Sequence, residues 1–120
     1  MYKATHDKMH NIITVKIWED FNVEQAEALH THLEQVMPRC KKGFRLLTDL
    51  SLLENMEQEA YRTIEKSMEL FNQHGVSKVI RVIPDPAKDI GFNIMSLFHY
   101  SSGVKIHTYQ SIKEAQKYLL

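Results

Sequence analysis

A short apolar run in the middle of the chain, Phe44–Leu50, constrains the fold more than any other stretch. Its apolar side chains do not alternate with polar ones; they are Phe44, Leu46, Leu47 and Leu50. The run is too short for a helix, follows Gly43 and ends at a polar turn, Asp49–Ser51. Such a run is typical of a strand that is buried on both faces. We therefore expect it to form a central strand of a covered sheet.

Directly after this strand, the sequence predicts the start of a long amphipathic helix. Asn55 is a suitable N-cap residue, and Gln58 stands three residues later, where it can complete a capping box. One face of the expected helix is apolar and carries Met56, Ala60, Ile64, Met68 and Phe71. Gly75 is a typical residue for its C-terminal end. The junction of a strand with a helix N-terminus is a common ligand or switch site in α/β sheets, so we expect any functional site here.

Strands and helices alternate along the rest of the chain. Further strands are expected at Tyr2–Thr5, Asn11–Trp18, Ser77–Ile83 and Val104–Thr108. Further helices are expected after Asn22, at Ala87–Tyr100 and after Ser111. Gln25 and Glu114 stand where they would complete capping boxes with Asn22 and Ser111. The first two strands can pair as a hairpin, and the later alternation requires right-handed crossovers between parallel strands.

This order of elements predicts an α/β fold. We expect a single domain over residues 1–120, with one mixed, mostly parallel sheet of four or five strands and about four helices. Fifteen basic and fifteen acidic residues cancel, so the chain has no net field that would recruit nucleic acid. Cys40 is the only cysteine, which suits a reducing cytoplasm. No stretch resembles a signal peptide or a membrane span, and we expect a cytoplasmic protein.

The sequence contains no recognisable catalytic or metal-binding motif. It has seven histidines, but His30 and His32 are two residues apart on an expected helix and point in different directions. No carboxylate or thiol stands at a known ligand spacing from a histidine. A constellation of base, nucleophile and oxyanion donors is also missing from the sequence. We therefore expect no enzyme activity, no metal site and no cofactor.

The carboxyl ends of parallel strands meet at one edge of a sheet, and we place the candidate binding site there. Its expected members are Trp18, Asp20, Asp49, Ser51, Leu53, Asn55, Gln58 and Asp85. The carboxylates make this edge locally acidic, while Trp18 and Leu53 supply apolar contact area. A partner with a basic rim around an apolar centre would be complementary to it. The simpler interpretation is that the polar members form caps and turns.

Two segments resemble STAS domains, the domains of sulfate transporters and anti-sigma-factor antagonists. They are LLTDLSLLENMEQEAY, residues 46–61, and VKIHTYQSIKEAQKYL, residues 104–119. Within these proteins the chain is most similar to the SpoIIAA-like family, also described as STAS/SEC14-like. In that family a strand ending in Asp-Leu-Ser precedes a short apolar link and an Asp-Ser dipeptide that opens a helix.

The resemblance fails at the residue that carries the family's phosphate switch. Alignment on Asp49–Ser51 puts Glu57 and Gln58 at the positions of the Asp-Ser dipeptide. A phosphate switch needs a hydroxyl at the helix N-terminus, where free N–H groups stabilise the phosphate. Gln58 has no hydroxyl, so we do not expect the switch in this chain.

The resemblance implies a non-enzymatic binding domain that acts through protein–protein contacts, either with a protein partner or with a second copy. Exposed apolar residues on the third helix would favour a homodimer. An alternative is a carrier or sensor of a small apolar, lipid-like ligand, as in SEC14-type relatives. A pocket for it would be lined by Met56, Met68, Phe92, Met95 and Phe98. These side chains are more simply explained as core, because their spacing is helical.

Overall fold

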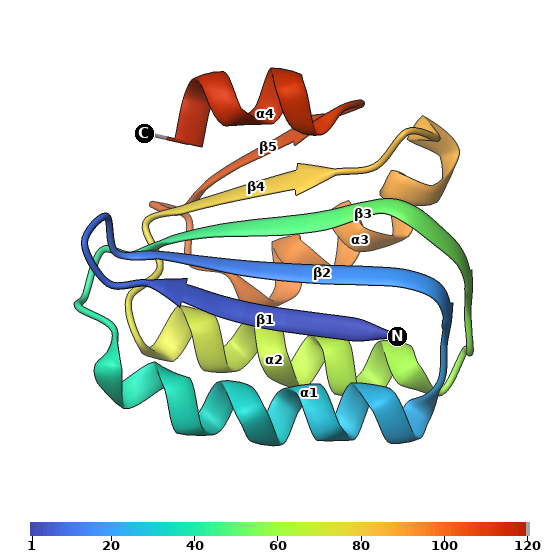
Figure 1. Ribbon diagram of the computed structural model, residues 1–120, viewed down its shortest axis with the longest axis horizontal. Helices are drawn as coiled ribbons and strands as arrows, with labels where there is room; N and C mark the ends of the chain where they lie inside the picture. Colours follow the sequence, from blue (N-terminus) through green and yellow to red (C-terminus); the bar gives the residue numbers. More distant parts are fainter. Residues whose placement is uncertain (120) are drawn as a thin grey trace.

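One five-stranded sheet forms the centre of the computed structural model, which describes residues 1–119 (Figure 1). Its strands are β1 (Tyr2–Asp7), β2 (Ile12–Phe21), β3 (Arg45–Met56), β4 (Lys78–Val82) and β5 (Lys105–Tyr109). The helices are α1 (Val23–Val36), α2 (Ala60–Gln73), α3 (Pro86–His99) and α4 (Ile112–Leu119), and a short 3-10 helix, η1 (Met37–Arg39), follows α1. This architecture confirms the predicted α/β fold class.

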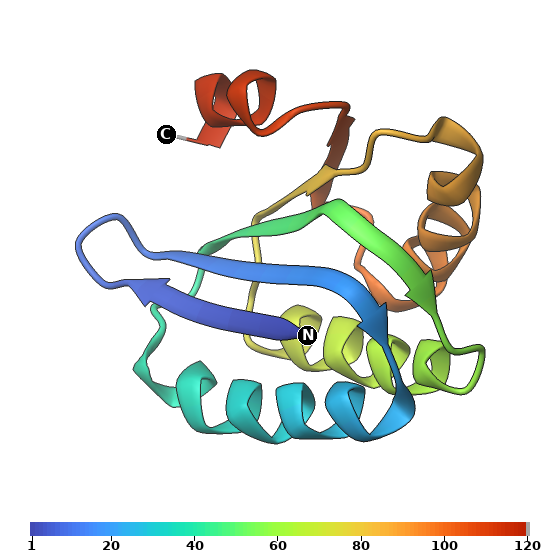
Figure 2. The same ribbon diagram turned by 45° about the vertical axis from the view of Figure 1, so that its right-hand side comes forward.

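The strands lie in sequence order across the sheet, from β1 to β5. β1 runs antiparallel to β2, and all other neighbouring strands are parallel. Leu46 of β3 is in register with Ile13 of β2 and with Val79 of β4. Figure 2 shows α1 and α2 beneath the sheet and α4 above it. The predicted hairpin and the inner positions of β3 and β4 are therefore confirmed.

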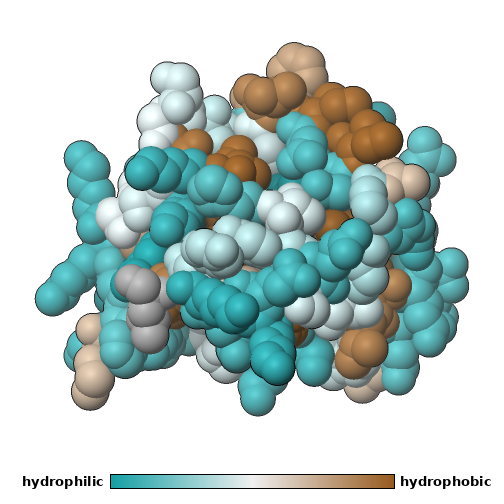
Figure 3. Space-filling view, turned by 90° about the horizontal axis from the view of Figure 1, so that it is seen from above, coloured by the Kyte–Doolittle hydropathy of each residue, from teal (hydrophilic) through white to brown (hydrophobic). Residues whose placement is uncertain are grey.

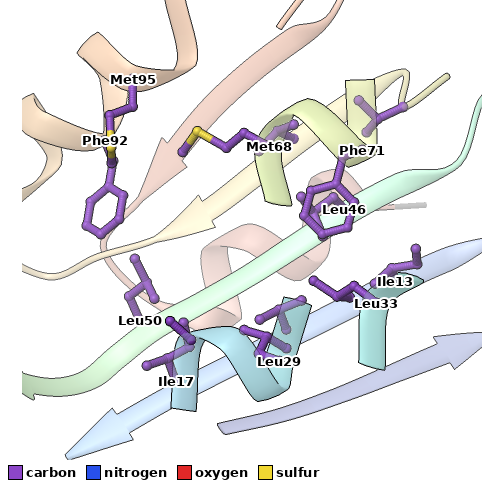
Figure 4. Packing of buried hydrophobic residues seen from close by; sticks show 14 of the residues in the cluster. Ile13, Ile17, Leu29, Leu33, Leu46, Leu50, Met68, Phe71, Phe92 and Met95 are labelled. Atoms are coloured by element: carbon purple, nitrogen blue, oxygen red, sulfur yellow. The ribbon is translucent and has the colours of Figure 1, made fainter. Parts of the chain in front are cut away.

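The core has two parts because side chains of β3 alternate between the faces of the sheet. The larger part joins β2, β3 and β4 to the three helices α1, α2 and α3; Figure 4 labels Ile13, Ile17, Leu29, Leu33, Leu46, Leu50, Met68, Phe71, Phe92 and Met95 within it. The smaller part lies under α4 and consists of Leu47, Ile80, Val82 and Ala115. β3 is thus buried on both faces, as its apolar run predicts.

Local side-chain caps begin three of the helices; at α4, the Ser111 hydroxyl accepts a hydrogen bond from the Glu114 backbone N–H at 3.2 Å. The Asn22 Oδ1 atom accepts a hydrogen bond from the Gln25 backbone N–H at 2.8 Å, and the Gln25 side chain accepts one from the Asn22 backbone N–H at 3.1 Å. This is the predicted capping box. At α3, the Asp85 carboxylate accepts a hydrogen bond from the Ala87 backbone N–H at 3.0 Å. These caps satisfy N–H groups that the first turn of a helix cannot pair.

The predicted start of α2 at Asn55 is wrong. β3 continues to Met56, and α2 begins at Ala60, where Glu59 occupies the N-cap position without a side-chain hydrogen bond. Asn55 instead pairs in register with Asp20 of β2, and its side-chain amide donates a hydrogen bond to the Asp20 carboxylate at 3.0 Å. Pairing with β2 therefore extends the strand past the local capping signal. Met56 accordingly belongs to the strand rather than to the helix.

Polar contacts hold α3 to its neighbours at both ends. The buried Arg81 guanidinium of β4 donates hydrogen bonds to Asp89 at 3.0 Å and to Ser96 at 2.8 Å. At the last turn, the His99 imidazole lies between two carboxylates of α2, with its Nε2 atom 2.8 Å from Glu65 and its Nδ1 atom 3.2 Å from Glu69. Both sets of contacts use the inner side of α3, and they leave its outer side uninvolved.

Replacement of Leu47 by alanine should create a cavity in the smaller core. Leu47 is buried between the sheet and α4, so the loss should lower the free energy of unfolding by about 2–5 kcal/mol. Urea denaturation measures this change. Leu52→Ala is the matched control, because Leu52 is 59% exposed on the same strand and its loss should change stability by about 0.5 kcal/mol or less. Equal effects of the two substitutions would contradict the assignment of Leu47 to the core.

The His99 contacts should make stability depend on pH. The hydrogen bond to Glu65 raises the pKa of His99 above its ordinary value, partial desolvation opposes the rise, and the hydrogen bond to Glu69 adds to it. The bonds therefore stabilise the fold fully below the pKa of a free histidine, and this contribution is lost as the pH rises through the raised pKa.

Urea denaturation of His99→Gln at two pH values tests this linkage. The variant should be less stable than wild type at about pH 6, and the difference should shrink by about pH 9. His107→Gln, which removes an exposed histidine from β5, should show no such trend. If the difference in the free energy of unfolding between His99→Gln and wild type stays constant or widens towards about pH 9, the charge of His99 does not stabilise α3.

Candidate functional site

The carboxyl ends of β2, β3 and β4 gather at one edge of the sheet, as predicted. Asp20 and Asn55 are bonded to each other across β2 and β3, and both are exposed. Trp18 is in register with Leu52 and is half-buried, with the Lys16 ammonium 5.5 Å from the centre of its ring. Residues in register share a face of the sheet, so Trp18 and Leu52 are neighbours on the side that carries α4.

Asp49 and Ser51 satisfy each other's polar groups. The Asp49 carboxylate accepts hydrogen bonds from the Ser51 hydroxyl at 2.6 Å and from the Ser51 backbone N–H at 3.0 Å. Asp49 is only 8% exposed, so it has little surface left for a partner. This pair therefore has the geometry of a local structural motif at the bend of β3.

A groove of about 190 Å³ separates the end of β3 from the start of α3. Its walls include Ser51 and Leu53 from β3, with Pro84, Asp85 and Lys88 on the opposite side. Asp85 already accepts the α3 capping bond, yet the residue remains exposed. The structure thus brings Ser51, Leu53 and Asp85 together.

Gln58 lies apart from these residues, in a groove between α1 and the N-terminal part of α2. The groove has a volume of about 670 Å³ and is lined by Val23, Glu27, Glu57, Gln58, Glu59, Arg62, Thr63 and Lys66. Acidic and basic side chains are mixed there, so neither sign of charge dominates. The eight predicted residues therefore occupy one edge of the sheet but do not form one site.

The outer side of α3 is a more contiguous apolar surface than this edge. Four large apolar side chains lie exposed on it: Ile90 at 61%, Ile94 at 51%, Leu97 at 81% and Phe98 at 80%. Their spacing puts them on one stripe, which we call the α3 stripe. Figure 3 shows a hydrophobic patch over this part of the molecule. The interpretation of Phe98 as a core or pocket residue is wrong, because the side chain faces solvent.

The sequence contains the signal for the α3 stripe, but the signal is ambiguous. The helix is apolar on both sides, with Phe92 and Met95 inside and Leu97 and Phe98 outside. Periodicity alone cannot decide which side is buried when both are apolar. The deciding contacts are those of Arg81 with Asp89, which fix the inner side of α3 and come from β4, the strand that precedes the helix.

A small cavity lies inside the larger core, between the sheet and the three helices beneath it. Its volume is about 50 Å³, and its lining is mostly apolar, including Leu46, Met68 and Phe92. Ligand pockets for small organic molecules usually measure about 300–1,000 Å³. The cavity is therefore far too small for a lipid chain.

Residues 1–119 contain no cluster of three or more histidine, cysteine, aspartate or glutamate side chains arranged to hold a metal ion. Burial raises the pKa of the Cys40 thiol, which disfavours the reactive thiolate. None of the helices in this range is long and apolar enough to cross a membrane.

No protein-family model matches this chain, and no curated protein matches it by sequence. Solved structures do match. An uncharacterised protein of the DUF3478 family from Shewanella loihica PV-4, with a SpoIIAA-like fold, superposes with a TM-score of 0.75 at 12% identity, covering 100% of this chain and 93% of its own.

Two regulatory proteins share the architecture. The Bacillus cell fate determinant SpoIIAA, in its phosphorylated form, superposes with a TM-score of 0.69 at 10% identity, over 100% of both chains. A putative anti-sigma factor antagonist from Thermotoga maritima gives a TM-score of 0.64 at 16% identity, over 99% of this chain and 94% of its own. At such identities the likeness shows the fold alone. The chain therefore has the SpoIIAA-like fold of STAS domains.

Proposed function

We propose that this protein is a non-enzymatic binding domain that docks another protein on the outer side of α3. The observation that carries the proposal is the α3 stripe, Ile90, Ile94, Leu97 and Phe98, each of them more than half exposed. Contiguous exposed apolar surface is rare on monomeric proteins and commonly marks an interaction site. Anti-sigma factor antagonists with the same fold support a regulatory binding role by analogy.

Folding of α3 does not require this stripe. The inner side of the helix is already held by buried Phe92 and Met95, by the Arg81–Asp89 ion pair and by His99. Leu97 and Phe98 contribute little to the core because they are about four-fifths exposed. Their apolar character is better explained by a partner that covers them.

The surroundings of α3 favour a partner with an apolar centre and a basic rim. The groove at its first turn brings Leu53 and Asp85 beside the helix. Two further exposed carboxylates stand at the same edge of the sheet: Asp20 and Glu54. Charges at the rim of an interface mainly speed association and respond to salt. Binding should therefore weaken as the salt concentration rises.

A phosphate switch at the start of α2 is not part of this proposal. Gln58 has no hydroxyl, and Glu57 and Glu59 on either side of it would repel a phosphate. Carriage of a lipid-like ligand is also less well supported, because the internal cavity measures only about 50 Å³. Self-association through the α3 stripe is a form of the same docking, with a second copy as the partner.

The double substitution Leu97→Ser/Phe98→Ser should abolish docking, because it removes the two most exposed apolar side chains of the α3 stripe. A partner captured from cell extract and then purified should bind this variant at least about tenfold more weakly than wild type. Isothermal titration calorimetry measures the affinity, and sedimentation of the isolated protein measures self-association. Circular dichroism checks that the variant folds.

Two further variants locate the interface. Met9→Ser removes an apolar side chain that is 87% exposed in the β1–β2 turn, and it should bind like wild type. Trp18→Ala/Leu53→Ser alters the edge of the sheet and should weaken binding less than the α3 variant does. If only the Trp18/Leu53 variant loses binding, the interface is the sheet edge and the assignment to α3 is wrong.

A further inference from the structure

A second groove, on the other side of the molecule from α3, has a different chemistry. It lies between β1 and the C-terminal part of α1, with Arg39 of η1 in its lining, and its volume is about 670 Å³. Six side chains line it: Ala4, His6, Lys8, His32, Val36 and Arg39. Four of these carry nitrogen donors, and none of the six is acidic. We propose that this groove, the β1–α1 groove, binds a small soluble molecule that carries a phosphate group.

The basic side chains of the β1–α1 groove are not engaged elsewhere. Within residues 1–119, the side chains of His6, Lys8, His32 and Arg39 make no hydrogen bond and no ion pair. The neighbouring carboxylates are occupied: Asp7 bonds His10 at 2.8 Å, and Glu34 lies 3.9 Å from His30. The positive charge of Lys8 and Arg39 is therefore uncompensated at the groove, although the chain as a whole is neutral.

His6 provides an independent indication of a ligand. Its Nε2 atom is buried and has no hydrogen-bond partner, and it is the one such side-chain atom found in the described residues. Leaving a buried polar atom unsatisfied costs free energy, so an unsatisfied group in a native structure calls for an explanation such as a water, an ion or a functional role. His6 also lines the β1–α1 groove, so a small rotation of its imidazole toward the groove would let Nε2–H donate a hydrogen bond to a phosphate oxygen.

The shape and lining of the groove favour a small molecule over a membrane surface. A groove of this size falls within the usual range for small-molecule sites. Arg39 of η1 and Lys8, which follows β1, both line the groove, so we expect the two cations to bind the same phosphate group. Ala4 and Val36 add apolar surface, so an organic phosphate should bind better than inorganic phosphate.

Phenyl phosphate is a suitable probe, because it joins a phosphate group to a small apolar ring. Titration of the full chain, followed by NMR, should give saturable shifts at Ala4, His6, His32 and Val36. Lys8→Gln/Arg39→Gln should weaken binding at least about tenfold, because it removes both fixed positive charges. Lys3→Gln/Arg62→Gln removes the same charge from positions outside the groove and should bind like wild type.

Three results would overturn the proposal. One is the absence of saturable shifts at the groove up to about 10 mM phenyl phosphate, because a dissociation constant above this concentration is too weak for a specific site. Another is equal binding by the Lys8/Arg39 variant and the Lys3/Arg62 control. The last is stronger binding to phosphatidylglycerol vesicles than to phenyl phosphate, which would assign the groove to a lipid surface. Because α3 is unchanged in all these variants, their outcome is independent of the docking proposal.

Discussion

Burial of β3 between two layers of helix determines the rest of the structure. Leu46 and Leu50 pack downward onto the helices that follow β2, β3 and β4, whereas Leu47 packs upward beneath α4. A strand buried on both faces must lie inside the sheet, and parallel neighbours then need helical crossovers. The inner position of β3 and the helical crossovers on either side of it follow from this constraint. α3 lies at one side of the lower layer, and its outer side is exposed.

Sequence patterns predict those parts of the fold that depend on local chemistry. The Asn22–Gln25 capping box and the unalternating run of β3 are confirmed in detail. The start of α2 is not predictable in this way, because Asn55 pairs with Asp20 of the neighbouring strand β2 instead of capping a helix. Contacts between residues 35 positions apart leave no periodic trace in a sequence. Arg81 stands only eight positions before Asp89, but a cation in a buried strand does not by itself indicate which side of the next helix it binds.

The sequence likewise predicts some features of the candidate site and not others. Topology correctly predicts that Ser51, Leu53 and Asp85 meet at the carboxyl ends of the strands. Topology does not predict that the Asp49 carboxylate is already hydrogen-bonded to Ser51, or that Gln58 lies in a separate groove. The Asp49–Ser51 bond is local and agrees with the simpler interpretation of these residues as turn formers, whereas the position of Gln58 depends on the extension of β3 to Met56. The apolar outer side of α3 is encoded, but only its exposure in the structure distinguishes it from core.

We infer that another protein covers the outer side of α3. NMR chemical-shift mapping of the isotope-labelled chain with its bound partner tests this most directly, because it reports every contact surface at once. If the partner covers the α3 stripe, the largest chemical-shift changes should fall on Ile90, Ile94, Leu97 and Phe98, with smaller changes at Leu53 and Asp85. Chemical-shift changes confined to the groove around Gln58, with α3 unchanged, would show that the partner does not dock on α3.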